Sequence, residues 1–256
     1  DDSWSGRLAT PKPNRSDGPL ATLEGARQIA GNTPVQLEAA RAGEQQALAR
    51  YKSGLSSVVE VAEAQRLGLR SRAAFKLMQL DDQFHLLTPG ARVVDLGAAP
   101  GGWTQVVLTR VRPAETGGRV VALDLSPMEP LPGVSQLQLD FMAAEAPERL
   151  REALAGPAHV VLSDMAQPTT GHAATDHLRI MALAETAYAF AAEVLLPGGS
   201  FVCKLFQGGA AQDLLTRLRK DFREVRHVKP PASRKESVEL YLVAQGYRRQ
   251  KEPIRG

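Results

Sequence analysis

The feature that most constrains this sequence is a regular alternation of apolar runs and helical patterns from residue 71 onward. Seven short apolar runs predict strands at residues 92–97, 119–125, 134–140, 159–164, 200–206, 223–229 and 237–247. Helical patterns separate most of these strands, which indicates a mostly parallel sheet with helices on both faces. No helical pattern separates the last two runs, so we expect a hairpin and a last strand that runs antiparallel to its neighbours. The predicted fold class is therefore α/β, with a mostly parallel seven-stranded, Rossmann-like sheet.

The chain divides into four predicted parts. Residues 1–31 are rich in Pro, Gly, Ser and Thr and predict a flexible segment. Residues 32–68 contain two helical patterns without visible chemistry and predict a helical extension. The main domain is expected at residues 69–247, and residues 248–256 form a basic tail.

Composition narrows the classes of protein that the chain can belong to. With 256 residues, 43% of them hydrophobic, the chain can bury one good core and carry an appendage. A single cysteine, Cys203, excludes an internal disulfide and indicates a reducing compartment. The sequence shows no apolar run long enough to span a bilayer and no signal peptide, so we expect a cytoplasmic protein that does not associate with a membrane.

Charge is distributed unevenly along the chain. The net charge is +3, but residues 217–256 hold twelve basic and five acidic residues, so this part carries +7 and the rest −4. A concentrated basic portion suits a polyanionic partner such as RNA. A solvated basic face without a partner is an equally good reading of charge alone.

The stretch VVDLGAAPGGW, residues 93–103, predicts a ligand site at the end of the first strand. Gly97, Gly101 and Gly102 permit a close approach to the backbone, and ligands of such sheets bind at the carboxyl ends of the strands. The loop lacks the Gly-Lys-Ser/Thr of a Walker A motif and the spacing of G-x-G-x-x-G. We expect a nucleoside-containing cofactor.

Acidic residues end three successive strands. Asp95 precedes the glycines, Asp124 ends the second strand and Asp140 ends the third. A carboxylate beside the glycines would repel a pyrophosphate but accept a cation, and an acid at the end of the second strand is typical of ribose binding. S-adenosylmethionine, with its sulfonium and ammonium groups, fits this pattern best. Each acid could instead cap a helix or a turn.

Three charged residues lie in or directly after strands near this site. Asp164 ends the fourth strand, and Lys204 and Glu239 lie inside the fifth and seventh. A charge within a central strand is costly unless it is paired, and these three strands are expected to be neighbours. The cluster could be a reaction site or a structural ion pair. Cys203 should face away from Lys204.

Two other groups of residues gain no role from the pattern. Lys76 lies among apolar residues of a predicted helix and could reach the surface by its tip. His172 and His177 do not share a helix face, which argues against a metal site.

Several motifs together resemble the FtsJ/RrmJ family of 2′-O-ribose methyltransferases. They are RSRAAFKL, VVDLGAAPGGWTQ, ALDLSPM, LQLDF, VLSDMAQPTTG, PGGSFVCKLFQGG and KPPASRKESVELYLVA, in unbroken order over residues 69–247. The resemblance implies a class I S-adenosylmethionine-dependent methyltransferase fold. It implies a reaction site of Lys76, Asp164, Lys204 and Glu239, and cofactor contacts by Gly101, Trp103, Asp124, Asp140 and Asp164. It also implies methylation of a uridine 2′-hydroxyl in 23S ribosomal RNA, within the large ribosomal subunit.

The sequence departs from the family pattern in two places. Residues 1–68 are longer and less basic than the usual arm and lack its Trp-containing helix, and Gln167 is inserted in SDMAQP. The core motifs also leave open a methyltransferase of transfer RNA or of mRNA caps, or a catalytically silent RNA-binding assembly factor. The basic residues Arg234 and Lys235 are the best candidates for phosphate contacts.

Overall fold

The computed structural model describes residues 58–166, 170–207, 212–234 and 237–248. The chain divides into two compact units, Asp1–Val58 and Val59–Gly256, and the second unit holds almost all of the described residues. The predicted flexible segment, most of the helical extension and nearly all of the basic tail lie outside the described residues.

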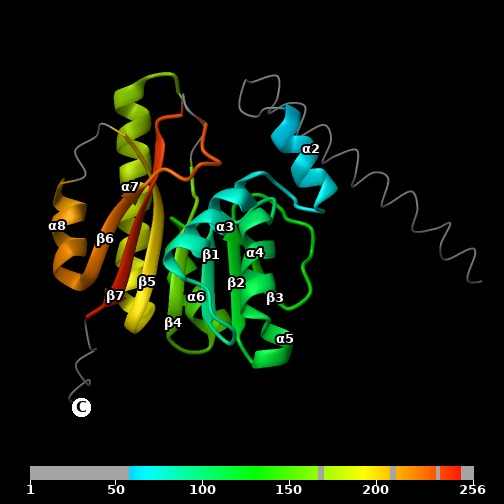
Figure 1. Cartoon of the computed structure of the whole chain (residues 1–256). Helices are drawn as coiled ribbons and strands as arrows, with labels where there is room; N and C mark the ends of the chain where they lie inside the picture. Colours follow the sequence, from blue (N-terminus) through cyan, green and yellow to red (C-terminus); the bar gives the residue numbers. More distant parts are fainter. Residues whose placement is uncertain (1–57, 167–169, 208–211, 235–236, 249–256) are drawn as a thin grey trace, which may run out of the picture. The chain divides into compact units, whose positions relative to one another are not determined.

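The second unit is built on one seven-stranded sheet (Figure 1). Its strands run in the spatial order β3-β2-β1-β4-β5-β7-β6. They are β1 (Arg92–Leu96), β2 (Arg119–Asp124), β3 (Val134–Gln138), β4 (Ala158–Ser163), β5 (Leu195–Phe206), β6 (Phe222–Val228) and β7 (Glu239–Tyr247). Strand β7 pairs antiparallel with both β5 and β6, and the other pairings are parallel. The predicted fold class and the antiparallel last strand are confirmed.

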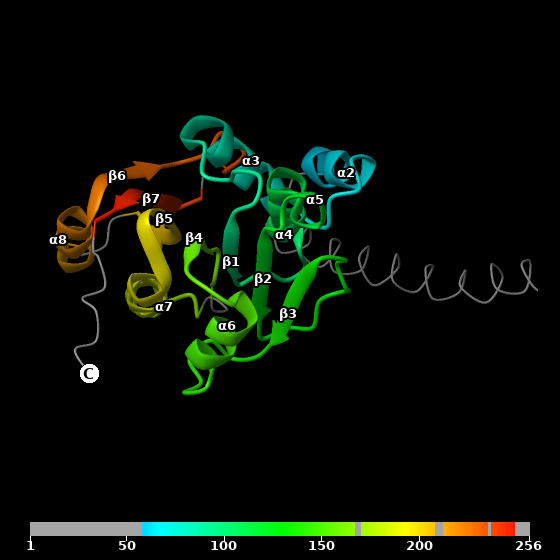
Figure 2. The same ribbon diagram turned by 90° about the horizontal axis from the view of Figure 1, so that it is seen from below.

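Helices cover both faces of the sheet (Figure 2). They are α2 (Val58–Arg66), α3 (Ala73–Phe84), α4 (Gly102–Val111), α5 (Pro113–Thr116), α6 (Ala146–Leu154), α7 (Ala173–Val194) and α8 (Gln212–Asp221). Side chains of α3 and α4 form one buried core with the sheet, and side chains of α6, α7 and α8 form the other. Burial of apolar surface on both faces is the main force that holds such a layered domain together.

Two elements differ from the sequence-based expectation. The single turn α5 was not expected, and it starts at a proline, which suits a first helical position. Strand β5 begins at Leu195 rather than at Ser200, because Leu195 pairs with Ala158 before an irregular stretch. The regular pairing resumes where Ser200 meets Val160.

The parallel register brings the ends of three strands to one edge. Leu96 lies beside Leu123 on β2 and beside Ser163 on β4. The amide of Gly97 donates to the carbonyl of Leu123 at 2.9 Å, and the amide of Asp164 donates to the carbonyl of Leu96 at 3.0 Å. The residues that follow β1, β2 and β4 therefore meet at the carboxyl edge of the sheet, where ligands of such folds bind.

Strand alternation separates Cys203 from its neighbour Lys204. Cys203 is fully buried in the core beneath α7 and α8, and burial raises the pKa of its thiol. Lys204 points to the opposite face of the sheet, toward α3 and α4, as predicted. None of the helices in the described ranges is both long and apolar enough to cross a membrane.

Candidate active site

Lys204 and Asp164 form a close pair at the end of β4 and β5. The Lys204 ammonium donates to the Asp164 carboxylate oxygen Oδ1 at 3.0 Å and to the Asp164 backbone carbonyl at 2.7 Å. The side chains are only 6% and 17% exposed. An ion pair this buried has lost most of its hydration, so its geometry must be well satisfied to be tolerated.

A second ion pair lies beside the first. Lys76, in the first turn of α3, donates to the Glu239 carboxylate oxygen Oε2 at 3.0 Å, and its side chain is 8% exposed. The structure therefore brings together all four residues of the expected reaction site. Lys76 is also buried, so the alternative in which the tip of its side chain reaches the surface is wrong.

Tyr241 joins the two pairs, and the sequence analysis did not single it out. Its hydroxyl donates to Asp164 Oδ1 at 2.7 Å and accepts from the Lys76 ammonium at 3.4 Å. Lys76 Nζ also lies 5.6 Å from the centroid of the Tyr241 ring. Tyr241 follows Glu239 by two residues, so strand alternation could have placed both on one face.

The surroundings keep Asp164 ionised and Tyr241 protonated. Burial acts to raise the pKa of Asp164, but Lys204, Lys76 and the Tyr241 hydrogen bond together hold that pKa below its ordinary value. Burial, reinforced by the negative charges of Asp164 and Glu239, holds the pKa of Tyr241 well above its ordinary value. The hydroxyl is thus fixed as the donor in its contact with Asp164.

The glycine loop is packed tightly by the protein itself. Gly97 has φ +78°, and a Cβ there would lie 2.8 Å from backbone atoms of Met165. Gly101 has φ +110°, and a Cβ there would lie 3.0 Å from the Arg70 side chain. A side chain on Gly102 would collide with Ser71. These glycines are therefore needed for the chain's own packing as well as for the approach of a ligand.

Trp103 reaches the loop by its backbone rather than by its ring. Its side chain is 3% exposed, its indole nitrogen donates to the Ala73 carbonyl at 2.8 Å, and its ring centroid lies 5.5 Å from that of Tyr241. Trp103 belongs to the first turn of α4, where backbone N–H groups lack helical acceptors. A cofactor contact by Trp103 would therefore use its backbone amide.

Two of the three strand-terminal acids, Asp124 and Asp140, cap a turn, which is the structural role that the sequence left open for them. Asp124 accepts from the amides of Ala99 at 2.9 Å and Ser126 at 2.7 Å. Asp140, which is exposed, accepts from the amide of Met142 at 2.9 Å. A carboxylate has about four acceptor sites, so both groups keep capacity for ribose hydroxyls.

Asp95 is the acid whose bonds are incomplete. It is fully buried, its Oδ2 accepts from the Thr104 hydroxyl at 2.7 Å, and its Oδ1 is buried without a hydrogen-bond partner. Burial, with smaller contributions from the charges of Asp164 and Asp124, raises the pKa of Asp95 to about 7. A buried acceptor without a donor, among carboxylates, fits a cationic ligand.

Known proteins resemble this chain in sequence and in structure. Residues 69–247 match the profile of the family described as FtsJ-like methyltransferase. The chain belongs to this family. It is therefore a methyltransferase.

Named relatives agree with this assignment. The ribosomal RNA large subunit methyltransferase E of Paramagnetospirillum magneticum is 62% identical over 190 residues, covering 73% of this chain and 78% of that protein. The protein of the same name from Gluconobacter oxydans is 51% identical over 229 residues, covering 89% and 83%. A crystal structure described as a ribosomal RNA methyltransferase of Plasmodium falciparum has a TM-score of 0.62 at 29% identity, covering 69% of this chain and 97% of that one.

Arg70 of this methyltransferase links the loops around the glycines. Its guanidinium donates to the carbonyls of Glu129 at 2.6 Å, Pro130 at 3.1 Å and Pro100 at 3.4 Å. Its amide donates to the Gln105 side chain at 2.8 Å. The start of the family domain thus holds the loop after β2 against the loop after β1. Sequence reasoning offered no signal for this role, because the contacts are to backbone carbonyls.

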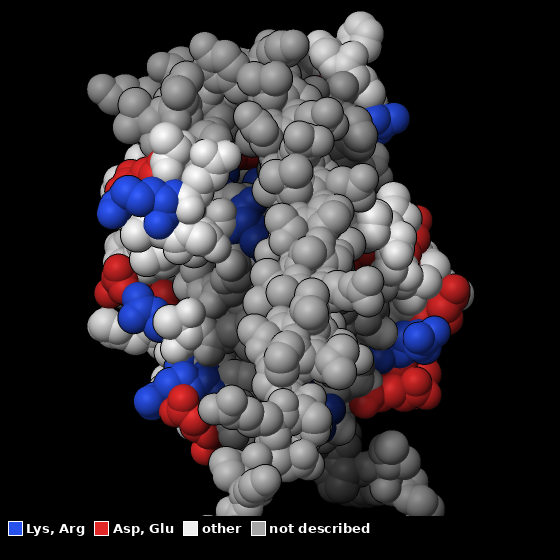
Figure 3. All heavy atoms as spheres, turned by 90° about the vertical axis from the view of Figure 1, so that its right-hand side faces the viewer, with Lys and Arg blue, Asp and Glu red and all other residues white. Residues whose placement is uncertain are grey.

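On the described part of the side shown in Figure 3, basic side chains lie close to acidic ones.

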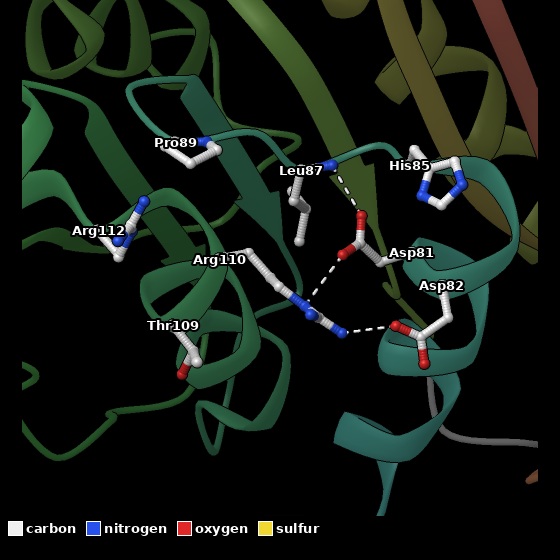
Figure 4. A pocket seen from close by; sticks show the side chains of 8 residues that line it. All are labelled: Asp81, Asp82, His85, Leu87, Pro89, Thr109, Arg110 and Arg112. Atoms are coloured by element: carbon white, nitrogen blue, oxygen red, sulfur yellow. Dashed lines mark hydrogen bonds and ion pairs between the residues drawn. The ribbon is translucent and has the colours of Figure 1, made fainter.

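A cavity of about 570 Å³ opens where α3 and α4 end, lined by residues such as His85, Arg110 and Arg112 (Figure 4). Arg110 pairs there with Asp81 at 3.1 Å and Asp82 at 2.6 Å. Lys76 lies at the other end of α3, so this cavity is separate from the cluster of charged residues at the carboxyl edge of the sheet. Within the described ranges, no group of His, Cys, Asp or Glu has the arrangement of a metal site.

Proposed function

We propose that this protein transfers a methyl group from S-adenosylmethionine to a ribose 2′-hydroxyl of large-subunit ribosomal RNA, on a uridine of 23S RNA. The observation that carries the proposal is the Lys204 ammonium, held by two hydrogen bonds to Asp164 at the carboxyl edge of the sheet. The names of the relatives support ribosomal RNA as the substrate.

The residues at the glycine loop fit S-adenosylmethionine. Asp124 and Asp140 have acceptor capacity for ribose hydroxyls. Gly101 is the N-cap of α4 and Trp103 lies in its first turn, at the end of the glycine loop. Asp164 supplies negative charge for a cation, and Asp95 adds to it when its carboxyl group is ionised. The cofactor would supply a methyl group bonded to a sulfonium sulfur, which leaves as a neutral thioether when the methyl group is transferred.

Lys204 is the residue that we assign to the 2′-hydroxyl. A hydroxyl is a weak nucleophile while it keeps its proton. Asp164 accepts two hydrogen bonds from the Lys204 nitrogen. Lys204 acts as a base only in its neutral form, after its third ammonium proton has passed to solvent; both remaining hydrogens then stay on Asp164 and the electron pair points to the third position. Lys204 then accepts the 2′-hydroxyl proton as the oxygen takes the methyl group.

Lys76 and Glu239 complete the site. Glu239 holds the Lys76 ammonium, and Lys76 orients the ribose or its phosphate by charge. Precise positioning of two bound reactants can supply roughly 7–11 kcal/mol toward the barrier.

RNA docking is proposed at the loop between β6 and β7. The amide of Ala232 donates to the Gln79 side chain of α3 at 2.8 Å, and Lys229 donates to the Ser237 carbonyl at 2.8 Å. The loop leads directly into Glu239, so its basic residue Arg234 lies close in sequence to the reaction site; Lys235 lies outside the described residues. An RNA substrate within the ribosomal subunit implies a cytoplasmic site of action.

Transfer of tritiated methyl groups tests the proposal. The purified protein is incubated with 23S RNA, large ribosomal subunits, transfer RNA and capped mRNA in parallel. We expect transfer to large-subunit RNA and resistance of the modified position to alkaline cleavage, which marks a 2′-O-methyl group. Preferred transfer to transfer RNA or caps would reassign the substrate, and no transfer to any of them would favour a silent assembly factor.

A further inference from the structure

The two ion pairs of the reaction site are connected through one hydroxyl group. In the described part of the chain, Lys204 bonds only to Asp164, and Lys76 bonds to Glu239 and Tyr241. The Tyr241 hydroxyl is the group that touches both pairs, since it accepts from Lys76 and donates to Asp164. The four charged residues therefore form one network by way of Tyr241.

The direction of each hydrogen bond in this network is determined. The Lys76 ammonium can only donate, and the Asp164 carboxylate can only accept. Tyr241 is fully buried and keeps its proton, so its single hydrogen is committed to Asp164 Oδ1 at 2.7 Å. The same oxygen accepts from Lys204 at 3.0 Å, which means that Tyr241 and Lys204 share one carboxylate oxygen.

The position of the hydroxyl is fixed by the fold. Tyr241 is the direct strand partner of Lys204 in the β5–β7 pairing. The Tyr241 ring packs against Trp103 of α4, with ring centroids 5.5 Å apart. A ring held by a strand and a helix has little freedom to rotate, so its hydroxyl can hold the Asp164 carboxylate in one orientation.

We propose that Tyr241 is a positioning residue for methyl transfer, whose hydroxyl joins the two ion pairs and keeps the Asp164 carboxylate ionised and oriented toward Lys204. This inference rests on the proposed function of the site. Without the hydroxyl, Asp164 loses a donor to its charged form and one of the two contacts that fix its oxygen. Lys204 then presents its electron pair to the substrate less consistently.

The test uses Tyr241→Phe in the full chain, with Tyr247→Phe as the matched control. Tyr247 lies on the same strand, is 3% exposed and donates its hydroxyl to the Ala192 carbonyl at 2.8 Å, in the core on the other face of the sheet. For Tyr241→Phe we expect a single-turnover rate about ten- to a hundred-fold lower, with cofactor affinity within about two-fold of the parent. We also expect its pH–rate profile to differ from that of the parent, because Asp164 directly contacts the Lys204 nitrogen that accepts the proton. Tyr247→Phe should leave both the rate and the pH profile unchanged, whatever it does to the melting temperature.

A second readout needs no RNA and separates this inference from the proposed function. The carboxyl carbon of Asp164 is followed by NMR in protein labelled at aspartate, with Asp164→Asn used to assign the signal. In Tyr241→Phe, Asp164 should titrate about one pH unit higher than in the parent and in Tyr247→Phe. An unchanged Asp164 titration, or a pH–rate profile that overlays the parent, would overturn the role of Tyr241. A parent protein that transfers no methyl group to RNA would instead count against the proposed function, and the titration would still decide whether Tyr241 controls Asp164.

Discussion

Lys204 donates two hydrogen bonds to the same residue, at 3.0 Å to the Asp164 carboxylate and at 2.7 Å to the Asp164 carbonyl. A purely structural ion pair needs only the first of these contacts. The second fixes the ammonium against the turn that follows β4, so that the remaining position on the nitrogen is directed rather than free to rotate. This arrangement suits proton transfer to a defined position.

Replacement of Lys204 should stop the reaction while sparing the cofactor site. We expect Lys204→Ala and Lys204→Arg to reduce single-turnover methyl transfer at least about a thousand-fold, because neither side chain can accept a proton near neutral pH. Cofactor affinity, measured by calorimetry, should change by less than about five-fold. The Ala variant should also be less stable, because Asp164 loses its nearest cation.

The exposed residue Lys220 of α8 supplies the control for Lys204. Lys220→Ala should match the parent in transfer rate and in melting temperature. Transfer near the parent rate by either Lys204 variant would show that Lys204 is only a structural partner of Asp164.

Asp95 should make both folding and cofactor binding depend on pH. Its pKa rises from 3.8 to about 7 in the folded chain, mainly through burial. The folded state therefore holds a proton that the unfolded chain has released, and the free energy of unfolding should fall as pH rises from 3.8 to about 7. A cationic cofactor favours the ionised carboxylate, so its affinity should increase with pH through about 7.

Asp95→Asn isolates these two effects, because an amide keeps the shape and does not titrate. In this variant the melting temperature should lose that part of its pH dependence, and cofactor affinity should become flatter between pH 6 and 8, roughly the range around the shifted pKa. Identical pH dependence of affinity in the parent and the variant would show that the buried carboxylate does not respond to the cofactor.

Asp124 should matter for the cofactor in two separable ways. Its carboxylate already accepts from the amides of Ala99 and Ser126, so Asp124→Ala would release the loop as well as remove a ribose acceptor. Asp124→Asn keeps one acceptor oxygen and should weaken binding of S-adenosylmethionine by about ten-fold, the loss of one hydrogen bond to a charged group. Calorimetry measures this change, and Asp82→Asn, a change at an exposed acid near the other end of α3, is the control. Tight binding of a nicotinamide dinucleotide instead would overturn the pocket assignment.

RNA affinity should depend steeply on salt if the loop between β6 and β7 contacts phosphates. Each phosphate contact contributes a slope of about −0.7 to −0.9 in a plot of log affinity against log salt concentration. We expect the double variant Arg234→Ala, Lys235→Ala to reduce the magnitude of that slope, measured by fluorescence anisotropy with a fragment of 23S RNA. An unchanged slope would place the RNA on another surface.

The sequence predicted the sheet well because its signals are local. The sequence shows continuous apolar strands, helical patterns between them and no helix between the last two strands. For a sheet of this class, that pattern makes the fourth, fifth and last strands neighbours, so Asp164, Lys204 and Glu239 could be placed together. The burial of Lys204 followed from the same reasoning, since it lies in an otherwise apolar strand.

The remaining parts of the site depend on contacts that the sequence does not show. Lys76 was placed only by family resemblance, because its partner Glu239 is 163 residues away. Trp103 was expected at the cofactor, but its ring belongs to the core, packed beneath α3 and α4. Tyr241 reads as an ordinary strand residue until its hydroxyl is seen beside Asp164. Such contacts arise from tertiary packing, which no local pattern encodes.

Arg70 provides the last prediction, because its guanidinium holds two loops together without any charged partner among its hydrogen bonds. It donates to the carbonyls of Glu129, Pro130 and Pro100, a set that only a forked group can reach. Arg70→Lys keeps the charge but not the fork, so we expect it to weaken cofactor binding by about five- to ten-fold. Hydrogen exchange should accelerate in residues 125–133, while the amides of β1 stay protected. The exposed Arg149 of α6 gives the control variant Arg149→Ala, which should change neither quantity. Parent-like affinity and exchange in Arg70→Lys would show that the loops keep their positions without the clamp, and that Arg70 acts only as a surface charge.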